Sequence, residues 1–406
     1  MIVVWVNKRD WKTPGPIVNM AVHNAASFAE LGYETHLCIG EGQASDTQAD
    51  LETYYGIPCD KRLQVHRIPR YRLFGASYSI SVFFHAYRLI TQLAASGPVA
   101  VFTRESGFLF FLARLCKHQR NVKGFYELHD LYADLSWVDE KRGGHRREWL
   151  YEHLLLPKIH GIVCITREQE KHYNAIFPHI PSCAFPLGTK PVAVGALPEA
   201  RRQRRTLMYV GHMHADKGID FLLAAAQRLA AEKVRILFWG GKPEKVGGFE
   251  QRAAVLGISD CVRFVPFQPP EQMHAAMARE ASLGVVMLKD TFYNRFLTCP
   301  VKALDYLSHG IPAIGSDIPS VHEVLADAGT YVPADHLDRF VDAVRGLLDD
   351  PDRYAAMAAR SRRRAGEISW QMRAKTLADF AASMQNPDAS AGAGFEHRSG
   401  SDIRKG

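Results

Sequence analysis

The sequence lacks the patterns of several well-defined classes of protein. Its seven cysteines are scattered, odd in number and without a C-x-x-C pair, which argues against a disulfide framework and suits a reducing compartment. No apolar run reaches the ~20 residues of a membrane span, and Lys8 and Arg9 follow too early for a secretory signal. We therefore expect a cytoplasmic protein.

Signatures of cofactor and metal chemistry are missing as well. The first predicted strand is not followed by G-x-G-x-x-G, the fingerprint of a dinucleotide oxidoreductase. No cluster of candidate metal ligands stands out either. An oxidoreductase is therefore the least supported hypothesis, and we predict an activity that needs neither a metal ion nor a cofactor.

What is present favours two globular domains. The chain has 406 residues and is 47% apolar, enough for two full cores. Strands and helices alternate along it, which predicts an α/β fold of two Rossmann-like, doubly wound domains facing a cleft. We assign residues 1–188 to an N-terminal domain and 189–366 to a C-terminal domain. Residues 367–385 are expected to form a helix that packs back on the first domain, and 386–406 a disordered tail.

Runs of β-branched and apolar residues give the expected strands. In the first half they are Ile2–Val6, Tyr33–Ile39, Val99–Thr103, Gly124–Leu128 and Gly161–Ile165. In the second half they are Leu207–Val210, Val234–Trp239, Val262–Val265, Leu283–Val286, Ala313–Gly315 and Thr330–Val332. Residues 186–205, with three prolines and a basic cluster, are the predicted linker.

The segment 298–317 predicts a helix aimed at a phosphate. Pro300 suits the first helical position, Thr298 or Cys299 the cap, and Gly310 the end. A helix N-terminus with Lys302 one turn inside would bind an anion, and Asp305 could hold sugar hydroxyls. The predicted donor-binding turn comprises Thr298, Cys299, Pro300, Val301 and Lys302. An ordinary surface helix with an ion pair is the open alternative.

Three motifs in order resemble family 4 (group 1) retaining glycosyltransferases of the GT-B fold. The pattern P-x-K-x-x-[E/D]-Y-x-x-x-G-x-P at residues 300–312 is similar to their nucleotide-binding motif. Residues 209–223 and the pair Ser369-Trp370 match two further segments, and the resemblance runs from Val3 to about Ala382. It implies a metal-independent hexosyltransferase that moves a sugar from a nucleotide-sugar, UDP- or GDP-linked, to a hydroxyl acceptor.

The resemblance assigns donor-side roles in the second half. Lys217 would grip the diphosphate as a catalytic residue beside Gly211, although a solvated lysine is the alternative. His212 stands where the family has arginine, so its share of phosphate binding is in doubt. The pair Gly240-Gly241 would approach the diphosphate or form a plain turn. Phe267 would flank the nucleobase or pack in the core.

Two positions of the motif depart from the family pattern. The family often has two glutamates eight residues apart; Asp305 occupies the second position, as a catalytic residue, and Leu297 the first. A non-catalytic nucleotide- or glycan-binding partner protein on the same fold is therefore the alternative function.

Acceptor-side roles fall on strand ends of the first half. His129 would reach the transferred sugar as a catalytic residue, unless it is structural, and Asp130 would orient it or bind acceptor. Glu105 would bind an acceptor hydroxyl or form a surface pair with Arg104. Gly15 would approach the donor or acceptor from the first loop.

The stretch from Lys61 to Lys123 has eleven Lys and Arg residues and a single acid, Glu105. Aromatic residues interleave with them, among them Phe83, Phe84 and Tyr87. We hypothesise that this face docks on an anionic membrane, on the inner side of the plasma membrane, and receives a lipid-linked acceptor. The alternative is a solvated basic face; without a recognised binding module, no nucleic-acid partner is expected.

Overall fold

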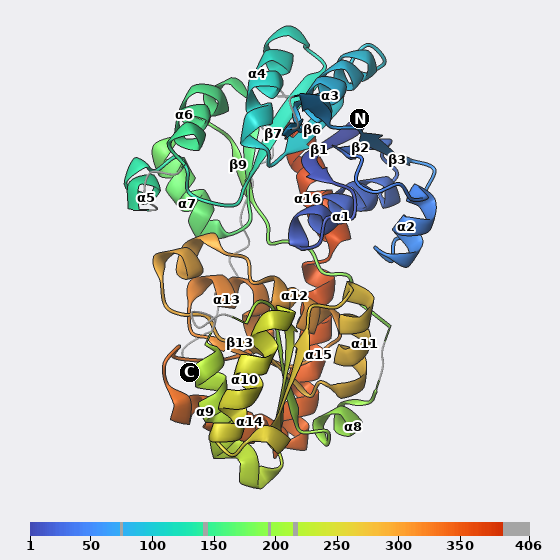
Figure 1. The fold of residues 1–406 in the computed structure, drawn as a ribbon. Helices are drawn as coiled ribbons and strands as arrows, with labels where there is room; N and C mark the ends of the chain where they lie inside the picture. Colours follow the sequence, from blue (N-terminus) through green and yellow to red (C-terminus); the bar gives the residue numbers. More distant parts are fainter. Residues whose placement is uncertain (74–75, 141–144, 194–195, 214–217, 385–406) are drawn as a thin grey trace.

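The computed structural model describes residues 1–73, 76–140, 145–193, 196–213 and 218–384. In these ranges the chain forms two large parallel β-sheets covered by helices, in two lobes stacked one above the other (Figure 1). This arrangement confirms the predicted α/β class with two doubly wound domains. The expected disordered tail, residues 386–406, lies outside the described residues.

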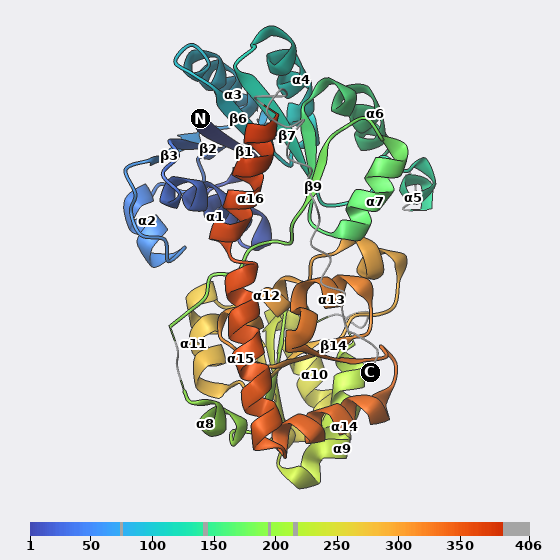
Figure 2. The same ribbon diagram turned by 180° about the vertical axis from the view of Figure 1, so that it is seen from behind.

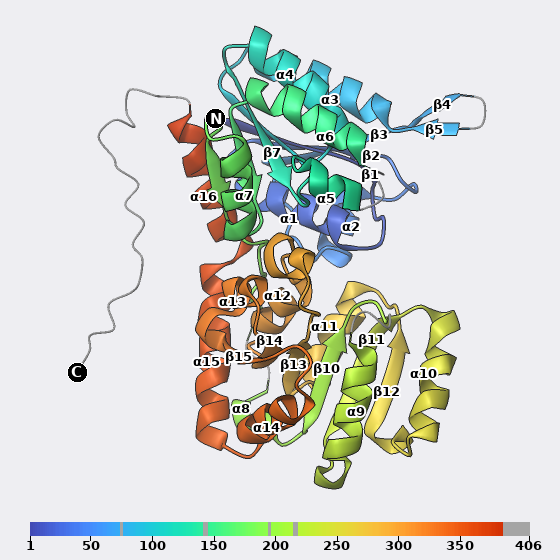
Figure 3. The ribbon, with the colours of Figure 1, turned by 90° about the vertical axis from the view of Figure 1, so that its left-hand side faces the viewer.

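The N-terminal lobe contains a sheet of order β3-β2-β1-β6-β7-β8-β9, in which every pair is parallel. Its strands are β1 Ile2–Asp10, β2 Thr35–Gly40, β3 Leu63–Ile68, β6 Val99–Thr103, β7 Val122–Leu128, β8 Gly161–Cys164 and β9 Ser182–Ala184. Its helices are α1 Pro16–Glu30, α2 Thr47–Thr53, α3 Ile80–Leu93, α4 Leu109–His118, α5 Leu135–Glu140, α6 Arg146–Leu155 and α7 Arg167–Ile176. An antiparallel hairpin, β4 Tyr71–Leu73 and β5 Ala76–Tyr78, projects from this lobe (Figure 3).

The C-terminal lobe contains a second parallel sheet, of order β12-β11-β10-β13-β14-β15. Its strands are β10 Thr206–Val210, β11 Arg235–Gly241, β12 Val262–Pro266, β13 Leu283–Val286, β14 Ala313–Ser316 and β15 Gly329–Val332. Its helices are α8 Pro198–Arg202, α9 Ile219–Leu229, α10 Pro243–Val255, α11 Pro270–Glu280, α12 Val301–Ser308, α13 Pro319–Leu325, α14 Leu337–Leu348 and α15 Pro351–Glu367. In each sheet the strand order reverses beside the strand that comes first in the sequence, β1 in one and β10 in the other. Doubly wound folds bind their ligands at this point.

Two crossings of the chain join the lobes. The first sheet ends at Ala184 and the second begins at Thr206, and the predicted boundary at 188/189 falls between them. Helix α15 runs along the C-terminal lobe, and α16, Trp370–Ser383, continues from it into the N-terminal lobe beside α1 (Figure 2). The crossings pair with each other, since the amide of Thr189 donates to Ile368 (2.9 Å) and the amide of Trp370 to Thr189 (3.0 Å).

Gly188 and Ser369 shape this junction. A Cβ on Gly188 would lie 2.4 Å from the ring of Trp370, so only glycine lets the linker pass against the indole. The hydroxyl of Ser369 accepts a hydrogen bond from the amide of Met372 and caps α16. The pair Ser369-Trp370 therefore opens α16, which lies within the residues 367–385 predicted to be helical.

Candidate functional site

Two glycines meet at the carboxyl edge of the C-terminal sheet. Gly211 follows β10 and Gly240 lies near the end of β11, with φ of +131° and +114°. The amide of Gly211 donates to Trp239 O at 2.9 Å, and a Cβ on Gly240 would lie 2.8 Å from Gly211 O. Both the left-handed backbone and the close approach require glycine here. Gly241 is also confined, because its Cβ would lie 2.8 Å from the sulfur of Met213.

Helix α12 begins one residue later than the sequence predicted. Pro300 is its N-cap rather than its first helical residue, with ψ of 90°, and no side chain caps the helix. Thr298 and Cys299 precede the cap, and burial raises the pKa of the Cys299 thiol to about 12. The C-terminal prediction is confirmed, because Gly310 follows the helix with φ of +61°.

The tyrosine of the motif fixes α12 against the sheet. The hydroxyl of Tyr306 donates to Met208 O at 2.7 Å and accepts from the amide of Val210 at 3.1 Å. Its ring packs on Gly284, where a Cβ would lie 2.3 Å from the ring. Tyr306 is fully buried, so α12 is held at the end of β10 by a side chain that cannot shift easily.

Lys302 lies directly beside the glycine edge. Its Nζ is 3.9 Å from the ring centroid of Tyr209, and 3.7 Å from the point that a Cβ of Gly211 would occupy. The structure therefore brings together Lys302, Gly211 and Gly240, as the sequence predicted for a phosphate site. Lys217, the other predicted lysine, lies outside the described residues.

His212 and Phe267 form an aromatic pair next to these glycines. Their ring centroids are 4.9 Å apart with the planes near perpendicular. The amide of Phe267 donates to Gly241 O at 2.9 Å. Phe267 as a whole is 48% exposed. Phe267 is therefore not a core residue, which excludes one of the two predicted alternatives and leaves its ring accessible to a ligand.

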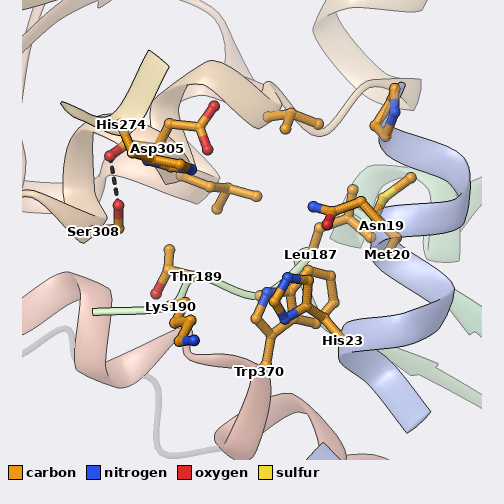
Figure 4. A pocket seen from close by; sticks show the side chains of 14 residues that line it. Asn19, Met20, His23, Leu187, Thr189, Lys190, His274, Asp305, Ser308 and Trp370 are labelled. Atoms are coloured by element: carbon orange, nitrogen blue, oxygen red, sulfur yellow. Dashed lines mark hydrogen bonds between the residues drawn. The ribbon is translucent and has the colours of Figure 1, made fainter. Parts of the chain in front are cut away.

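Asp305 faces a pocket between the two lobes (Figure 4). The cavity of about 80 Å³ is lined by α1, the linker, α11, α12 and the start of α16. Val301, the last residue of the predicted donor-binding turn, also lines this cavity, and 36% of its surface is exposed. Burial raises the pKa of Asp305 to about 7.

Basic side chains from three elements line the same pocket. They are His23 on α1, Lys190 of the linker and His274 on α11 (Figure 4). Burial, with the charge of Lys190, lowers the pKa of His23 to about 3 and also lowers that of His274. Both imidazoles are therefore neutral near pH 7, and Asp305 is the group of this pocket that changes charge there.

His129 directly follows β7 and is held by a buried carboxylate. Its Nε2 lies 2.5 Å from Glu127 Oε1, and its side chain is 16% exposed. Burial lowers the pKa of His129, the charge of Arg104 lowers it further, and Glu127 opposes both. A neutral imidazole beside an ionised carboxylate donates through Nε2, which leaves Nδ1 as an acceptor.

The other oxygen of Glu127 pairs with Arg373 of α16. Nη2 of Arg373 lies 2.5 Å from Oε2, and both side chains are buried. Arg373 also donates to Asn24 Oδ1 at 3.1 Å and to Pro186 O at 3.0 Å. Burial favours the neutral form of Glu127, but Arg373, His129 and Arg104 together lower its pKa to about 2. The network thus ties the candidate site to the crossing helix.

Neither Glu127 nor Arg373 was predicted from the sequence to be a residue of the site. Only the motif context of Y-E-L-H-D could have indicated Glu127. Arg373 carried no signal, because an arginine in an amphipathic helix is ordinarily exposed.

The two predicted acceptor-side carboxylates lie in different surroundings. Oδ1 of Asp130 accepts from Trp137 Nε1 at 2.7 Å and from the amide of Leu131 at 2.9 Å. Glu105 is not in a surface pair with Arg104. It is 5% exposed and bonds to Lys8, Nζ to Oε2, at 3.0 Å.

Gly15 caps α1 with φ of +110°. It lines a second cavity, of about 110 Å³, together with Arg9, Thr13 and residues 14–18. A Cβ on Gly15 would meet no atom within 4 Å. The backbone of Gly15 therefore borders open space in the loop between β1 and α1.

Leu297 lies in the apolar contact between the lobes. It ends a π-helical turn, Tyr293–Leu297, and packs fully buried with N-terminal residues such as Leu131 and Tyr173. Beside it, the hydroxyl of Thr166 donates to Phe296 O at 2.5 Å. The position where the resembling family carries a carboxylate is therefore used here to join the lobes.

The described stretches lack two kinds of feature. They contain no helix long and apolar enough to cross a membrane. They also contain no group of three or more His, Cys, Asp and Glu side chains placed to hold a metal ion.

The two stacked, doubly wound sheets with a crossing C-terminal helix define the GT-B class of fold. Solved structures of this class overlay on nearly the whole chain. Sucrose-phosphate synthase from Thermosynechococcus elongatus does so with a TM-score of 0.67 at 16% identity, over 94% of this chain and 98% of that one. HepE from Anabaena in complex with UDP does so with a TM-score of 0.66 at 12% identity, over 94% and 100%.

Sequence comparisons agree with this class. Residues 204–350 match the family described as glycosyl transferases group 1. The D-inositol 3-phosphate glycosyltransferase of Corynebacterium urealyticum is 26% identical over 335 residues, 72% of this chain and 76% of that protein. Other relatives of that name align over less than half of their own length. Together these findings support a glycosyltransferase.

Proposed function

We propose that the protein is a retaining glycosyltransferase that moves a hexose from a UDP- or GDP-sugar to a hydroxyl acceptor. The observation that carries this proposal is the placement of Lys302 against the glycine edge of Gly211 and Gly240. A cation, open backbone and a helix N-terminus at one sheet edge suit a diphosphate. The complex of HepE with UDP, on the same fold, supports a nucleotide donor.

Each remaining residue has a defined task in this proposal. Asp305 accepts hydrogen bonds from ribose hydroxyls, and Phe267 stacks on the base. His129, neutral and held by Glu127, accepts a hydrogen bond at Nδ1 from a hydroxyl of the transferred sugar. The N-terminal lobe, with Asp130 near Tyr293 of the other lobe, receives the acceptor.

The anomeric configuration is retained if the acceptor hydroxyl attacks the anomeric carbon from the face that the diphosphate leaves. The bond between the anomeric carbon and the phosphate oxygen breaks, and the departing oxygen takes the proton of the attacking hydroxyl. The protein then supplies positioning and charge stabilisation, chiefly through Lys302, Lys217 and the N-terminus of α12. No metal ion has a role in these steps, so activity should persist in EDTA; complete loss that Mg²⁺ or Mn²⁺ restores would refute this part.

The acceptor side is proposed to meet an anionic membrane in bacterial envelope or exopolysaccharide synthesis. Within the basic stretch from Lys61 to Lys123, apolar side chains on α3 and α4 face solvent, with Phe84 54% and Phe110 66% exposed. Exposed rings among cations suit a lipid surface rather than a purely solvated face. Flotation with anionic vesicles tests this; absence of salt-sensitive binding would exclude membrane docking.

A two-stage assay tests the function. Thermal shifts with UDP, GDP and ADP identify the nucleotide, and hydrolysis of the corresponding sugars then reports on chemistry. Lys302→Met should abolish both the thermal shift and the hydrolysis, whereas Lys375→Met, at an exposed position, should change neither of them. Binding without hydrolysis by the wild type across the whole donor panel would favour the non-catalytic binding protein instead, which the comparisons do not favour.

A further inference from the structure

A buried guanidinium nitrogen without a partner lies at the carboxyl end of strand β6. Arg104 directly follows β6, the central strand of the first sheet, and its side chain is partly buried. Its Nη1 is shielded from solvent, yet no acceptor in the described ranges contacts it. Buried polar groups almost always have partners in folded proteins. This nitrogen therefore indicates a group that arrives with a ligand.

The carboxylates around Arg104 are committed to other cations. Glu105, next to it in sequence, bonds to Lys8 at 3.0 Å. On the neighbouring strand, Glu127 uses one oxygen for His129 and the other for Arg373, each at 2.5 Å. Neither carboxylate therefore accepts from the guanidinium of Arg104, which keeps its hydrogen-bonding capacity for something else.

Arg104 lies where the two lobes meet. Its positive charge lowers the pKa of His129, after burial, on its own lobe. It also acts on Tyr293 of the C-terminal lobe. Burial and the charge of Asp130 raise the pKa of Tyr293, and the charge of Arg104 lowers it. A ligand that reaches Arg104 would therefore lie between the sugar-contacting histidine and the opposite lobe.

We infer that Arg104 binds an anionic group of the acceptor, a phosphate ester or a carboxylate, beside His129. This inference rests on the proposed function, which places the donor diphosphate on the other lobe at Lys302 and Gly211. Only the acceptor then remains to bring an anion to the N-terminal sheet. A guanidinium binds phosphate and carboxylate with two parallel hydrogen bonds, so it selects for such a group strongly.

Titration of small anions into the full chain tests the inference without turnover. The protein is first saturated with the nucleoside diphosphate that stabilises it, so that the donor site is occupied. Inorganic phosphate and glucuronate are then titrated separately by calorimetry. Arg104→Gln should weaken binding by about 10- to 100-fold, and Arg104→Lys, which keeps the charge but not the fork, by less.

The controls separate this inference from the proposed function. Arg279→Gln removes an equal charge from a side chain that is 71% exposed and should leave anion binding unchanged. Unchanged nucleotide affinity of Arg104→Gln shows that the variant is folded and that the donor site is intact.

The outcomes also identify the acceptor chemistry. Binding of phosphate alone assigns a phosphate ester, and binding of glucuronate alone a uronic acid. No binding of either anion by the wild type, or equal binding by wild type and Arg104→Gln, overturns the inference. Failure of every nucleotide to bind would instead overturn the proposed function.

Discussion

Replacing Arg373 by methionine should destabilise the fold more than most single substitutions. The change removes a buried ion pair to Glu127 and hydrogen bonds to Asn24 and to the carbonyls of Phe185 and Pro186. Breaking a buried pair leaves an uncompensated charge and costs about 3–5 kcal/mol. That is a large part of the roughly 5–15 kcal/mol that stabilises a typical protein. Urea unfolding followed by circular dichroism measures the loss.

The pH dependence of this loss has a defined sign. In the wild type the pKa of Glu127 is held near 2, below its ordinary 4.5, so its stabilising contribution is present above pH 4.5 and lost as pH falls toward 2. Without Arg373 burial dominates and raises that pKa, so ionisation of Glu127 then costs stability. The difference between wild type and variant should therefore be larger at pH 7 than at pH 4.

Two further variants decide whether this reasoning holds. Lys375→Met, on the same helix, removes an exposed pair with Asp379 and should leave the urea midpoint unchanged. Adding Glu127→Gln to Arg373→Met should restore part of the loss, because the buried charge disappears. The reasoning is refuted if Arg373→Met and Lys375→Met unfold at the same urea concentration.

Three further outcomes are expected. Nucleotide affinity should fall by up to about tenfold between pH 8 and pH 6 through Asp305, whose pKa lies near 7, because the ionised carboxylate binds ribose hydroxyls better. The terminal phosphate of the nucleotide titrates in the same range, so Asp305→Asn should make the slope less steep; an equally steep slope for wild type and variant in calorimetry would contradict the assignment. Gly240→Ala should lose nucleotide binding and about 1–3 kcal/mol of stability, because its Cβ would strike Gly211 O, whereas Gly247→Ala, with open space around it, should do neither. Tyr306→Phe should cost about 1–3 kcal/mol in urea unfolding, since it leaves two backbone groups of β10 unpaired; an unchanged midpoint would show that the hydroxyl does not anchor α12.

The sequence predicted most strands well but missed both edge strands of the first sheet. Strands β6 and β13 have the predicted bounds, Val99–Thr103 and Leu283–Val286, because continuous apolar runs buried on both faces leave little ambiguity. Strands β3 and β9 were missed. Leu63–Ile68 lies at a sheet edge with a half-exposed, polar middle, and three-residue β9 is too short to show a period.

The meeting of Lys302, Gly211 and Gly240 was predictable because each lies in a local motif. Gly211 follows β10, Gly240 lies near the end of β11, and Lys302 lies in the first turn of α12, so the order of elements brings them to one sheet edge. The buried network was not predictable. Glu127 and Arg373 are 246 residues apart in sequence, and only the return of α16 to the N-terminal lobe places them in contact. The partner of Glu105 was missed for the same reason, since Lys8 reaches it from β1.

A crystal structure of the protein with a bound nucleoside diphosphate tests the central claim most directly. We predict the diphosphate at the backbone of Gly211, within hydrogen-bonding distance of Lys302 Nζ, and the ribose hydroxyls at Asp305. A nucleotide bound elsewhere, with Lys302 still stacked on Tyr209 and remote from the phosphates, would contradict the account.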